Sequence, residues 1–280
     1  MLLGVHVPVK GGIYNVFQQA EILDCNTIQL FSRSPQRWRQ KVLTPRDIEK
    51  FNSLREKSNI KPVFIHIPYL INLASPEQEL YEASIQAYIE DINEADALGA
   101  EYIVTHMGSH KKTSEGAGLH RLIKAINIIF ERTQHTKVGM LLENTSGSGS
   151  WLGYKFIHQK EVLRGIKCKE RAGFCLDTAH AYSAGYNIAD KNGLEDTLDE
   201  IDSLVNCELI KLIHFNDTKD KLGSRRDRHE HIGKGFIGLE GMKRILNHRK
   251  LRNKAFILET PKDSENADKI NLDAVRSLRR

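Results

Sequence analysis

Histidine and acidic residues end a series of apolar segments along the whole chain. His6, His66 and His106 occupy such positions in the first part of the sequence. In the rest of the chain the corresponding residues are Glu143, Asp177, His214 and Glu259, and His180 follows shortly after Asp177. Imidazole nitrogens and carboxylate oxygens are the ordinary protein ligands of zinc. The residue types and their positions therefore indicate metal chemistry.

One such residue alone has an ordinary explanation. A single histidine at a strand end is more often a hydrogen-bonded core residue, and a single acid often caps the next helix. Many of them gathered at one place are harder to explain, because buried carboxylates without cations do not stay ionised cheaply. A divalent cation removes this conflict. The mixture of histidine with Asp and Glu favours Zn2+, with Mn2+ or Fe2+ as substitutes.

The candidate ligands are too many for one ion. A catalytic zinc uses about three protein ligands and keeps one position open for water. Asp227 and His229, in the sequence D-R-H, add two more candidates. We therefore expect two or three ions that share a bridging carboxylate, an arrangement suited to phosphodiester cleavage.

The apolar segments predict eight strands of a parallel sheet. Their near-continuous apolar character, without alternation, is typical of strands buried on both faces. The segments are residues 2–7, 27–31, 62–67, 102–107, 138–144, 172–177, 209–217 and 255–260. Only the second lacks a candidate ligand at its end; an Arg-rich segment follows it.

Helix signals lie between these segments. Thr44-Pro45-Arg46-Asp47 predicts a helix start, and Ser75-Pro76-Glu77 predicts another for a helix that runs to Leu98 and ends at Gly99. One strand and one helix recur roughly every 35 residues, which predicts a (β/α)8 TIM barrel. We expect one domain over residues 1–280. In such barrels the active site lies at the C-terminal ends of the strands, where the candidate ligands stand.

Composition narrows the class of protein. The chain has 280 residues, 40% of them hydrophobic, without a basic leader or a long apolar span. We expect a soluble, cytoplasmic monomer that does not bind membranes, with its four scattered cysteines as free thiols. The net charge of +5 suits a polyanionic partner. The basic residues cluster in two segments, Arg33, Arg37 and Arg39, and Lys219, Lys221, Arg225, Arg226 and Arg228.

Eight short motifs occur in order on these predicted strand ends. They are GVHVPVKGG from Gly4, HIPYLINL from His66, HMGSH from His106, LENTSGSG from Leu142, GFCLDTAH from Gly173, HFNDTK from His214, LGSRRDRH from Leu222 and ILET from Ile257. Together they make the chain resemble, nearly end to end, the endonuclease IV family of apurinic/apyrimidinic (AP) endonucleases, which are TIM barrels of the xylose-isomerase-like type.

The resemblance implies a centre of three zinc ions. One ion would be held by His66, His106 and Glu143. Glu143 would bridge to a second ion, which Asp177, His214 and Glu259 also hold. The third would be held by His180, Asp227 and His229. Glu143 and Glu259 are the carboxylates to which the resemblance assigns a catalytic role.

The activity implied is a step of base excision repair. The family hydrolyses the phosphodiester on the 5′ side of an abasic site in double-stranded DNA and leaves a 3′-hydroxyl and a 5′-deoxyribose phosphate. A protein nucleophile is not required, because zinc lowers the pKa of bound water to near neutrality.

The same mapping implies the DNA contacts. Tyr69 and Leu70 match residues that enter the base stack beside the lesion, and Arg225 and Arg228 are placed to grip phosphate. Two departures stand out. The family's S-P-R-x-W reads S-P-Q-R-W here, so that Gln36 takes the position of an Arg that enters the DNA, with Arg37 next to it. Ala179 stands where the family commonly has Cys.

Two alternatives remain open from the sequence. A single-metal sugar isomerase or epimerase of the xylose-isomerase type would use Glu143, Asp177, His214 and Glu259, but would leave the other candidate ligands idle. A lesion-binding protein without turnover is suggested by Gln36. A count of metal ions separates the first alternative from the nuclease, and an incision assay separates the second.

Overall fold

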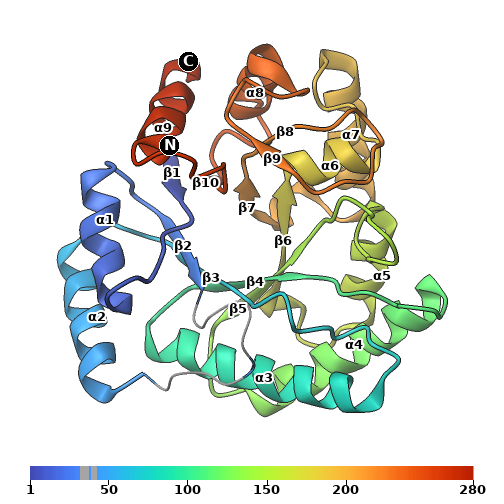
Figure 1. Cartoon of the computed structure of the whole chain (residues 1–280). Helices are drawn as coiled ribbons and strands as arrows, with labels where there is room; N and C mark the ends of the chain where they lie inside the picture. Colours follow the sequence, from blue (N-terminus) through green and yellow to red (C-terminus); the bar gives the residue numbers. More distant parts are fainter. Residues whose placement is uncertain (32–37, 39–42, 280) are drawn as a thin grey trace.

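Parallel strands form the centre of the molecule, and helices surround them (Figure 1). The computed structural model describes residues 1–31, 38 and 43–279. The eight parallel strands are β1 Leu2–Val5, β2 Ile28–Phe31, β3 Val63–His66, β4 Tyr102–His106, β5 Gly139–Glu143, β6 Ala172–Asp177, β7 Ile210–His214 and β10 Ala255–Leu258. Each lies within one of the eight predicted segments, so this prediction is confirmed.

The sheet closes on itself. Its strand order is β1-β10-β7-β6-β5-β4-β3-β2, which leaves β1 and β2 at the two ends. These ends meet at a parallel bridge between His6 and Gln29, where the backbone N–H of Val7 donates to the carbonyl oxygen of Gln29 at 2.7 Å. The fold is a TIM barrel, as the sequence predicted.

The α-helices cover the outside of the barrel (Figure 1). They are α1 Val16–Ile22, α2 Pro45–Lys57, α3 Gln78–Ala97, α4 Glu115–Arg132, α5 Phe156–Gly165, α6 Thr178–Ala184, α7 Lys191–Leu204, α8 Gly238–Asn247 and α9 Ala267–Leu278. Short 3-10 turns stand at Ile13–Asn15, Lys169–Arg171 and Cys207–Leu209. The last helix, α9, packs beside β1, so that both ends of the chain lie on the same side of the barrel (Figure 1).

One of the two predicted helix starts is confirmed, and the other is wrong by two positions. Thr44 caps α2 as expected: its side chain accepts a hydrogen bond from the Asp47 backbone N–H, and Asp47 accepts one from the Thr44 backbone in return. The start of α3 was predicted two positions too early. The Ser75 hydroxyl accepts from the Glu77 N–H at 3.1 Å in a turn before the helix, which begins only at Gln78.

A second difference concerns the segment 209–217. The strand β7 ends at His214, and Asp217–Thr218 form a separate short strand, β8. This strand pairs antiparallel with β9, His229–Glu230, outside the barrel. The D-R-H sequence is therefore carried back to the barrel mouth by a small ribbon that the apolar pattern did not indicate.

Strand alternation directs the candidate ligands into the barrel. Side chains two residues apart on a strand share a face. A buried apolar residue of the barrel interior stands two positions before each ligand at the ends of six strands; these residues are Phe64, Val104, Leu141, Cys175, Leu212 and Ile257. The apolar layer fills the lower interior, so the next inward position, at the C-terminal mouth, is where the His and acidic residues converge.

The structure also bears on the predictions about the cysteines and about membrane-spanning segments. Among the described residues, all four cysteines are free, and Cys25, Cys175 and Cys207 are buried. Within the same part of the chain, no helix combines the length and apolar character that crossing a bilayer requires.

The closing seam of the barrel depends on a glycine. A Cβ atom at Gly4 would lie 1.8 Å from the backbone carbonyl oxygen of Thr27, so that the backbone would have to shift. Replacing Gly4 by Ala should therefore lower the free energy of unfolding by about 1–3 kcal/mol. Urea unfolding followed by circular dichroism measures this. Gly116→Ala in α4 is the matched control, because nothing lies within 4 Å of its Cβ position; equal losses in both variants would contradict the prediction.

Candidate metal centre

Three groups of metal-ligating side chains meet at the mouth of the barrel. The groups are His66, His106 and Glu143; Glu143, Asp177, His214 and Glu259; and Asp177, His180 and His229. Within each group the ligand atoms all lie within 4.8 Å of one another. Glu143 belongs to the first and second groups, and Asp177 to the second and third. Residues from distant parts of the sequence thus form one continuous cluster.

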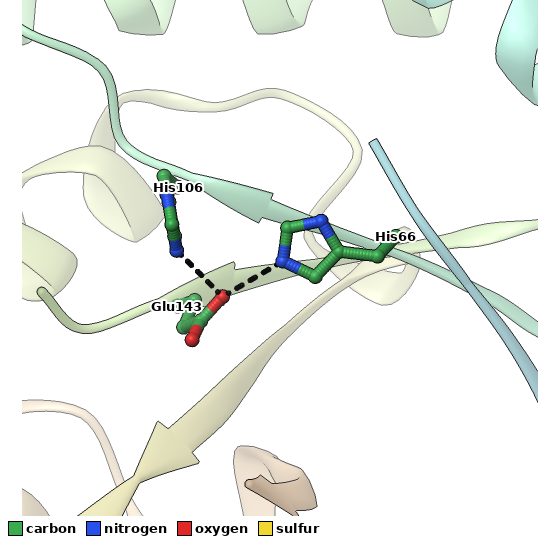
Figure 2. A group of neighbouring side chains, drawn as sticks. All are labelled: His66, His106 and Glu143. Atoms are coloured by element: carbon green, nitrogen blue, oxygen red, sulfur yellow. Dashed lines mark hydrogen bonds and ion pairs between the residues drawn. The ribbon is translucent and has the colours of Figure 1, made fainter. Parts of the chain in front are cut away.

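The first group converges on a single oxygen atom. The Nε2 atoms of His66 and His106 both lie 3.2 Å from Oε2 of Glu143, as Figure 2 shows. The other ring nitrogen of His66 donates to the Ile67 carbonyl oxygen at 2.7 Å. That bond places the ring proton on Nδ1, which leaves Nε2 of His66 as a lone-pair donor facing the carboxylate.

The second group uses the opposite oxygen of Glu143. His214 Nδ1 lies 2.9 Å from Glu143 Oε1 and 3.3 Å from Glu259 Oε2. It also lies 4.0 Å from Asp177 Oδ2. Because the two oxygens of one fully buried carboxylate face two different groups, Glu143 has the geometry of a bridging ligand.

The third group lies towards the ribbon of β8 and β9. Asp177 Oδ2 is 3.7 Å from His229 Nε2. Asp227 is outside the compact group but adjoins it, with its two oxygens 3.1 Å from His180 Nε2 and 3.4 Å from His229 Nε2. Its side chain is 49% exposed, whereas Asp177 is fully buried. The D-R-H sequence therefore reaches the cluster from the solvent side.

Two asparagines that the sequence analysis missed hold these ligands in place. Asn144 accepts from the Asp177 N–H at 2.8 Å through Oδ1, and its backbone oxygen accepts from His180 Nδ1 at 2.9 Å. Asn216 donates to Asp177 Oδ2 at 2.8 Å and accepts from the Glu259 N–H at 2.8 Å. Their signal in the sequence is position: Asn144 directly follows Glu143, and Asn216 stands two residues after His214.

The ribbon is anchored by a buried carboxylate. Asp217 accepts hydrogen bonds from the backbone N–H groups of Gly235, Ile237 and Gly238 at 3.0, 3.0 and 3.2 Å. Because β8 begins at Asp217 and pairs with β9, these bonds also fix the strand that carries His229. No local signal in the sequence indicates this role, because the backbone groups that Asp217 binds lie 18 to 21 positions further along the chain.

The electrostatics of the cluster fit a divalent cation. Burial would lower the pKa of His214, but Cys175 beside it and the carboxylates of Glu259 and Glu143 raise it well above its ordinary value. Burial would likewise raise the pKa of Glu143, yet His214 and its other histidine neighbours hold it well below. His180 behaves as His214 does, because nearby aspartates outweigh its burial. Without metal, the buried carboxylates thus require protonated imidazoles as counter-charges.

One orphaned atom points in the same direction. The Nε2 atom of His229 is buried and has no hydrogen-bond partner within the described part of the chain. Its other ring nitrogen donates to the Glu259 carbonyl oxygen at 3.0 Å, so Nε2 is left as a lone pair. A buried lone pair directed at carboxylates is unfavourable unless a cation lies between them. The donor set fits zinc, whose ligands are imidazole and carboxylate.

A cavity of about 200 Å³ opens beside the cluster. It is lined by Tyr69, His106, Thr145, Ser146, Ser148, Trp151, His180 and Asp227. The Trp151 ring stands edge-on to His106, with centroids 5.7 Å apart. Three of the lining residues are metal-ligand candidates, so a molecule in this cavity would contact the cluster directly. Trp151 and the two serines were not predicted as site residues from the sequence.

The predicted DNA contacts lie around this mouth or outside the described residues. Tyr69 is 58% exposed at the cavity wall, and Leu70 beside it is half-buried. Arg225 stacks over the Tyr154 ring at 4.9 Å. Arg228 is already paired with a carboxylate, because its Nε donates to Asp220 at 2.8 Å.

Four residues of the Arg-rich segment cannot be compared with the structure. Gln36 and Arg37, with Arg33 and Arg39, lie outside the described residues. His158 is buried outside the metal-ligand groups, and its Nδ1 accepts from the Gly153 N–H at 3.0 Å.

Comparison with known proteins places the chain among relatives of this architecture. The profile of the family "Xylose isomerase-like TIM barrel" matches residues 17–280. A "Probable endonuclease 4" from Halothermothrix orenii is 39% identical over 280 residues, which is 100% of both chains. Another from Methanoculleus marisnigri is 40% identical over 278 residues, covering 99% of each chain.

Solved structures agree with the sequence relatives. Endonuclease IV from Thermus thermophilus superposes with a TM-score of 0.89 at 34% identity, over 99% of this chain and 98% of the other. A D-tagatose 3-epimerase-like protein has a TM-score of 0.74 at 18% identity, over 99% and 96% of the two chains, and shares the fold alone. By full-length sequence identity and by fold, this chain belongs to the endonuclease IV family of xylose isomerase-like TIM barrels.

Proposed function

We propose that this protein is a zinc-dependent AP endonuclease that cleaves double-stranded DNA on the 5′ side of an abasic site, leaving a 3′-hydroxyl and a 5′-deoxyribose phosphate. The observation that carries the proposal is the set of three ligand groups joined through Glu143 and Asp177. One metal would need only one such group. Family membership supports the same reading, since the full-length relatives bear the name endonuclease 4.

Three zinc ions would be held by nine side chains. We assign His66, His106 and Glu143 to the first ion; Glu143, Asp177, His214 and Glu259 to the second; and His180, Asp227 and His229 to the third. The closeness of Asp177 Oδ2 to His229 supports Asp177 as a further shared ligand. When bound, zinc supplies Lewis acidity that activates water near neutral pH and neutralises charge on a phosphate. Mn2+ and Fe2+ are substitutes with related ligand preferences.

The chain's own residues would bind the DNA and exclude its normal bases. The cavity between Tyr69 and Trp151 opens onto the cluster, and the Ser146 and Ser148 side chains in its wall can donate hydrogen bonds to phosphate oxygens. Tyr69, exposed at the rim, and Leu70 would enter the base stack beside the lesion, where lost pairing makes unstacking least costly. Arg225 and Arg228, and Gln36 with Arg37, would complete the contacts.

The partner is DNA that contains abasic sites, the protein acts as a monomer in the cytoplasm, and Glu143 and Glu259 are catalytic through the metals they hold. The net charge of +5 is consistent with a polyanionic substrate.

A single-metal sugar isomerase or epimerase is the second candidate. It is favoured by one observation: Glu143, Asp177, His214 and Glu259 already form a complete group. It leaves unexplained why His66, His106, His180 and His229 converge on the same carboxylates. Likeness of fold at 18% identity to an epimerase-like protein adds nothing specific to sugar chemistry.

Metal analysis combined with incision tests the proposal. Purified protein should contain about three zinc ions per chain, by analogy with the three ligand groups, and should cut a 32P-labelled duplex carrying one abasic-site analogue. Prolonged chelation should abolish cleavage, and added zinc should restore it. One ion per chain would favour the isomerase, and zinc-loaded protein that binds the duplex without cutting it would indicate a lesion-binding protein.

Loss of the bridging carboxylate of Glu143 should strongly reduce incision. Glu143→Ala removes the only side chain that belongs to both the first and second groups among the described residues, so incision should fall by at least about 10²-fold, the lower end of the loss seen when one group that stabilises the transition state is removed. Zinc content should fall in parallel. Glu115→Ala is the matched control, an acid at the start of α4 outside the ligand groups. Turnover within tenfold of wild type in Glu143→Ala would rule out the bridging assignment.

Zinc affinity should weaken as the pH falls. The pKa values of His214 and His180 are raised well above their ordinary value in the metal-free protein, so both are protonated at neutral pH and must lose a proton to bind metal. Each displaced proton lowers the apparent affinity by about tenfold per pH unit below that pKa. The apparent zinc affinity is measured between pH 6 and 8 by competition with a chromophoric chelator. The measured values are corrected for protonation of the chelator itself. An affinity independent of pH would contradict it.

A further inference from the structure

We infer that Gln29 is a positioning residue for the metal centre, which selects the tautomer of His214 and orients Glu259. The inference rests on the proposed function, because it takes both residues to be metal ligands. Gln29 lies on β2, the one strand of the barrel for which the sequence offered no ligand. Its side chain nevertheless points into the cluster and is fully buried.

The amide of Gln29 joins three side chains. Its Oε1 lies 2.8 Å from His214 Nε2. Its Nε2 donates to Glu259 Oε1 at 2.7 Å and lies 3.0 Å from Nδ1 of His6. One amide thus contacts two ligands of the second group and a third residue at the barrel seam.

Chemistry fixes which way round the amide stands. The reverse orientation would set the amide oxygen 2.7 Å from the Glu259 carboxylate, where two acceptors repel each other. The oxygen therefore faces His214. Since an amide oxygen only accepts hydrogen bonds, His214 must carry a proton on Nε2 to fill this contact.

The tautomer follows directly. In neutral imidazole one nitrogen carries the proton and the other has the lone pair. When His214 gives up a proton to bind metal, the proton held on Nε2 by Gln29 stays, so the lone pair is on Nδ1, the atom that lies 2.9 Å from Glu143 and 3.3 Å from Glu259. The same atom is the one a metal would use. A hydrogen bond to the outer nitrogen is a common way for proteins to orient a metal-binding histidine.

The remaining acceptor of the network is His6. Gln29 Nε2 points at His6 Nδ1, which in turn lies 3.5 Å from Glu259 Oε1. The ring of His6 packs against Phe31, with centroids 4.3 Å apart. Because its Nδ1 accepts from the amide, His6 is a partner of Gln29, and it belongs to none of the ligand groups among the described residues.

The backbone makes Gln29 a rigid support. Gln29 is the residue at which the barrel closes, bridged to His6 and bonded to the Val7 N–H at 2.7 Å. A side chain on a closed seam is held on both flanks and has little freedom to follow a misplaced ligand. This rigidity is what positioning to within a fraction of an ångström requires.

The test compares Gln29→Met with Thr27→Val. Methionine keeps the length and apolar volume of glutamine but has neither the amide donor nor its oxygen. Thr27 is the matched control, because it is also fully buried, directly precedes β2, and loses a 2.6 Å hydrogen bond to Pro62 that does not involve the cluster. Zinc affinity is measured for all three proteins by chelator competition, and folding by circular dichroism and thermal unfolding.

Gln29→Met should bind zinc at least about tenfold more weakly than wild type, the lower end of the effect of outer hydrogen-bond partners on metal affinity. Thr27→Val should bind as wild type does. Equal affinity in Gln29→Met and wild type would overturn the inference while leaving the proposed function intact. Failure of wild type itself to bind zinc would instead overturn the proposed function.

A second measurement does not depend on the variant's folding. In zinc-loaded wild type labelled with 15N-histidine, the ring nitrogens of His214 should show a protonated Nε2 and a metal-bound Nδ1 in long-range 1H–15N spectra. Zinc on Nε2 with the proton on Nδ1 would overturn the inference. A residue with a merely structural role in β2 would not determine which nitrogen of another side chain is protonated.

Discussion

The carboxylate of Glu143 is fully buried, and both of its oxygens face imidazole nitrogens at 2.9 to 3.2 Å. An ionised acid in such a place is costly unless positive charge surrounds it. His214 and His180, whose pKa values are raised, provide that charge in protonated form, and histidines from three strands and from the start of α6 lie around the carboxylate where a cation would supply it. Much of the barrel mouth can be understood as the consequence of keeping this one charge buried.

The parallel strands bring the ligands to Glu143 because the side chains of a strand point alternately into and out of the barrel. An apolar layer fills the interior, and the next inward position of six strands carries a ligand. Asn144 and Asn216 then fix Asp177 through its backbone N–H and its carboxylate, and Asn216 also fixes the backbone N–H of Glu259. The third group depends instead on the short ribbon of β8 and β9, which the buried carboxylate of Asp217 fixes. The centre is thus built partly by the barrel and partly by one anchored loop.

The same barrel serves proteins of other activities. A D-tagatose 3-epimerase-like protein shares the fold at 18% identity. In this chain one four-residue group stands at the centre of the mouth, and two further groups extend from it through Glu143 and Asp177. Function in this architecture is decided by such additions at the strand ends and not by the barrel itself.

The sequence by itself determined the strands, the barrel and the identity of the candidate ligands. Apolar runs that end in His, Asp or Glu are local signals, and the strand period alone tells which residue faces inward. Thr44 shows the same for a helix start, since its capping partner is three residues away.

Contacts across the barrel were decided only by the tertiary structure. Nothing in the sequence brings Gln29 to within hydrogen-bond distance of His214 and Glu259, because these residues are 185 and 230 positions away. Gln29 has no ligand chemistry of its own, and its role exists only where β1 and β2 close the sheet. The ribbon that carries His229 was missed for the same reason: two-residue strands leave no periodic pattern, and their pairing is fixed by long-range hydrogen bonds.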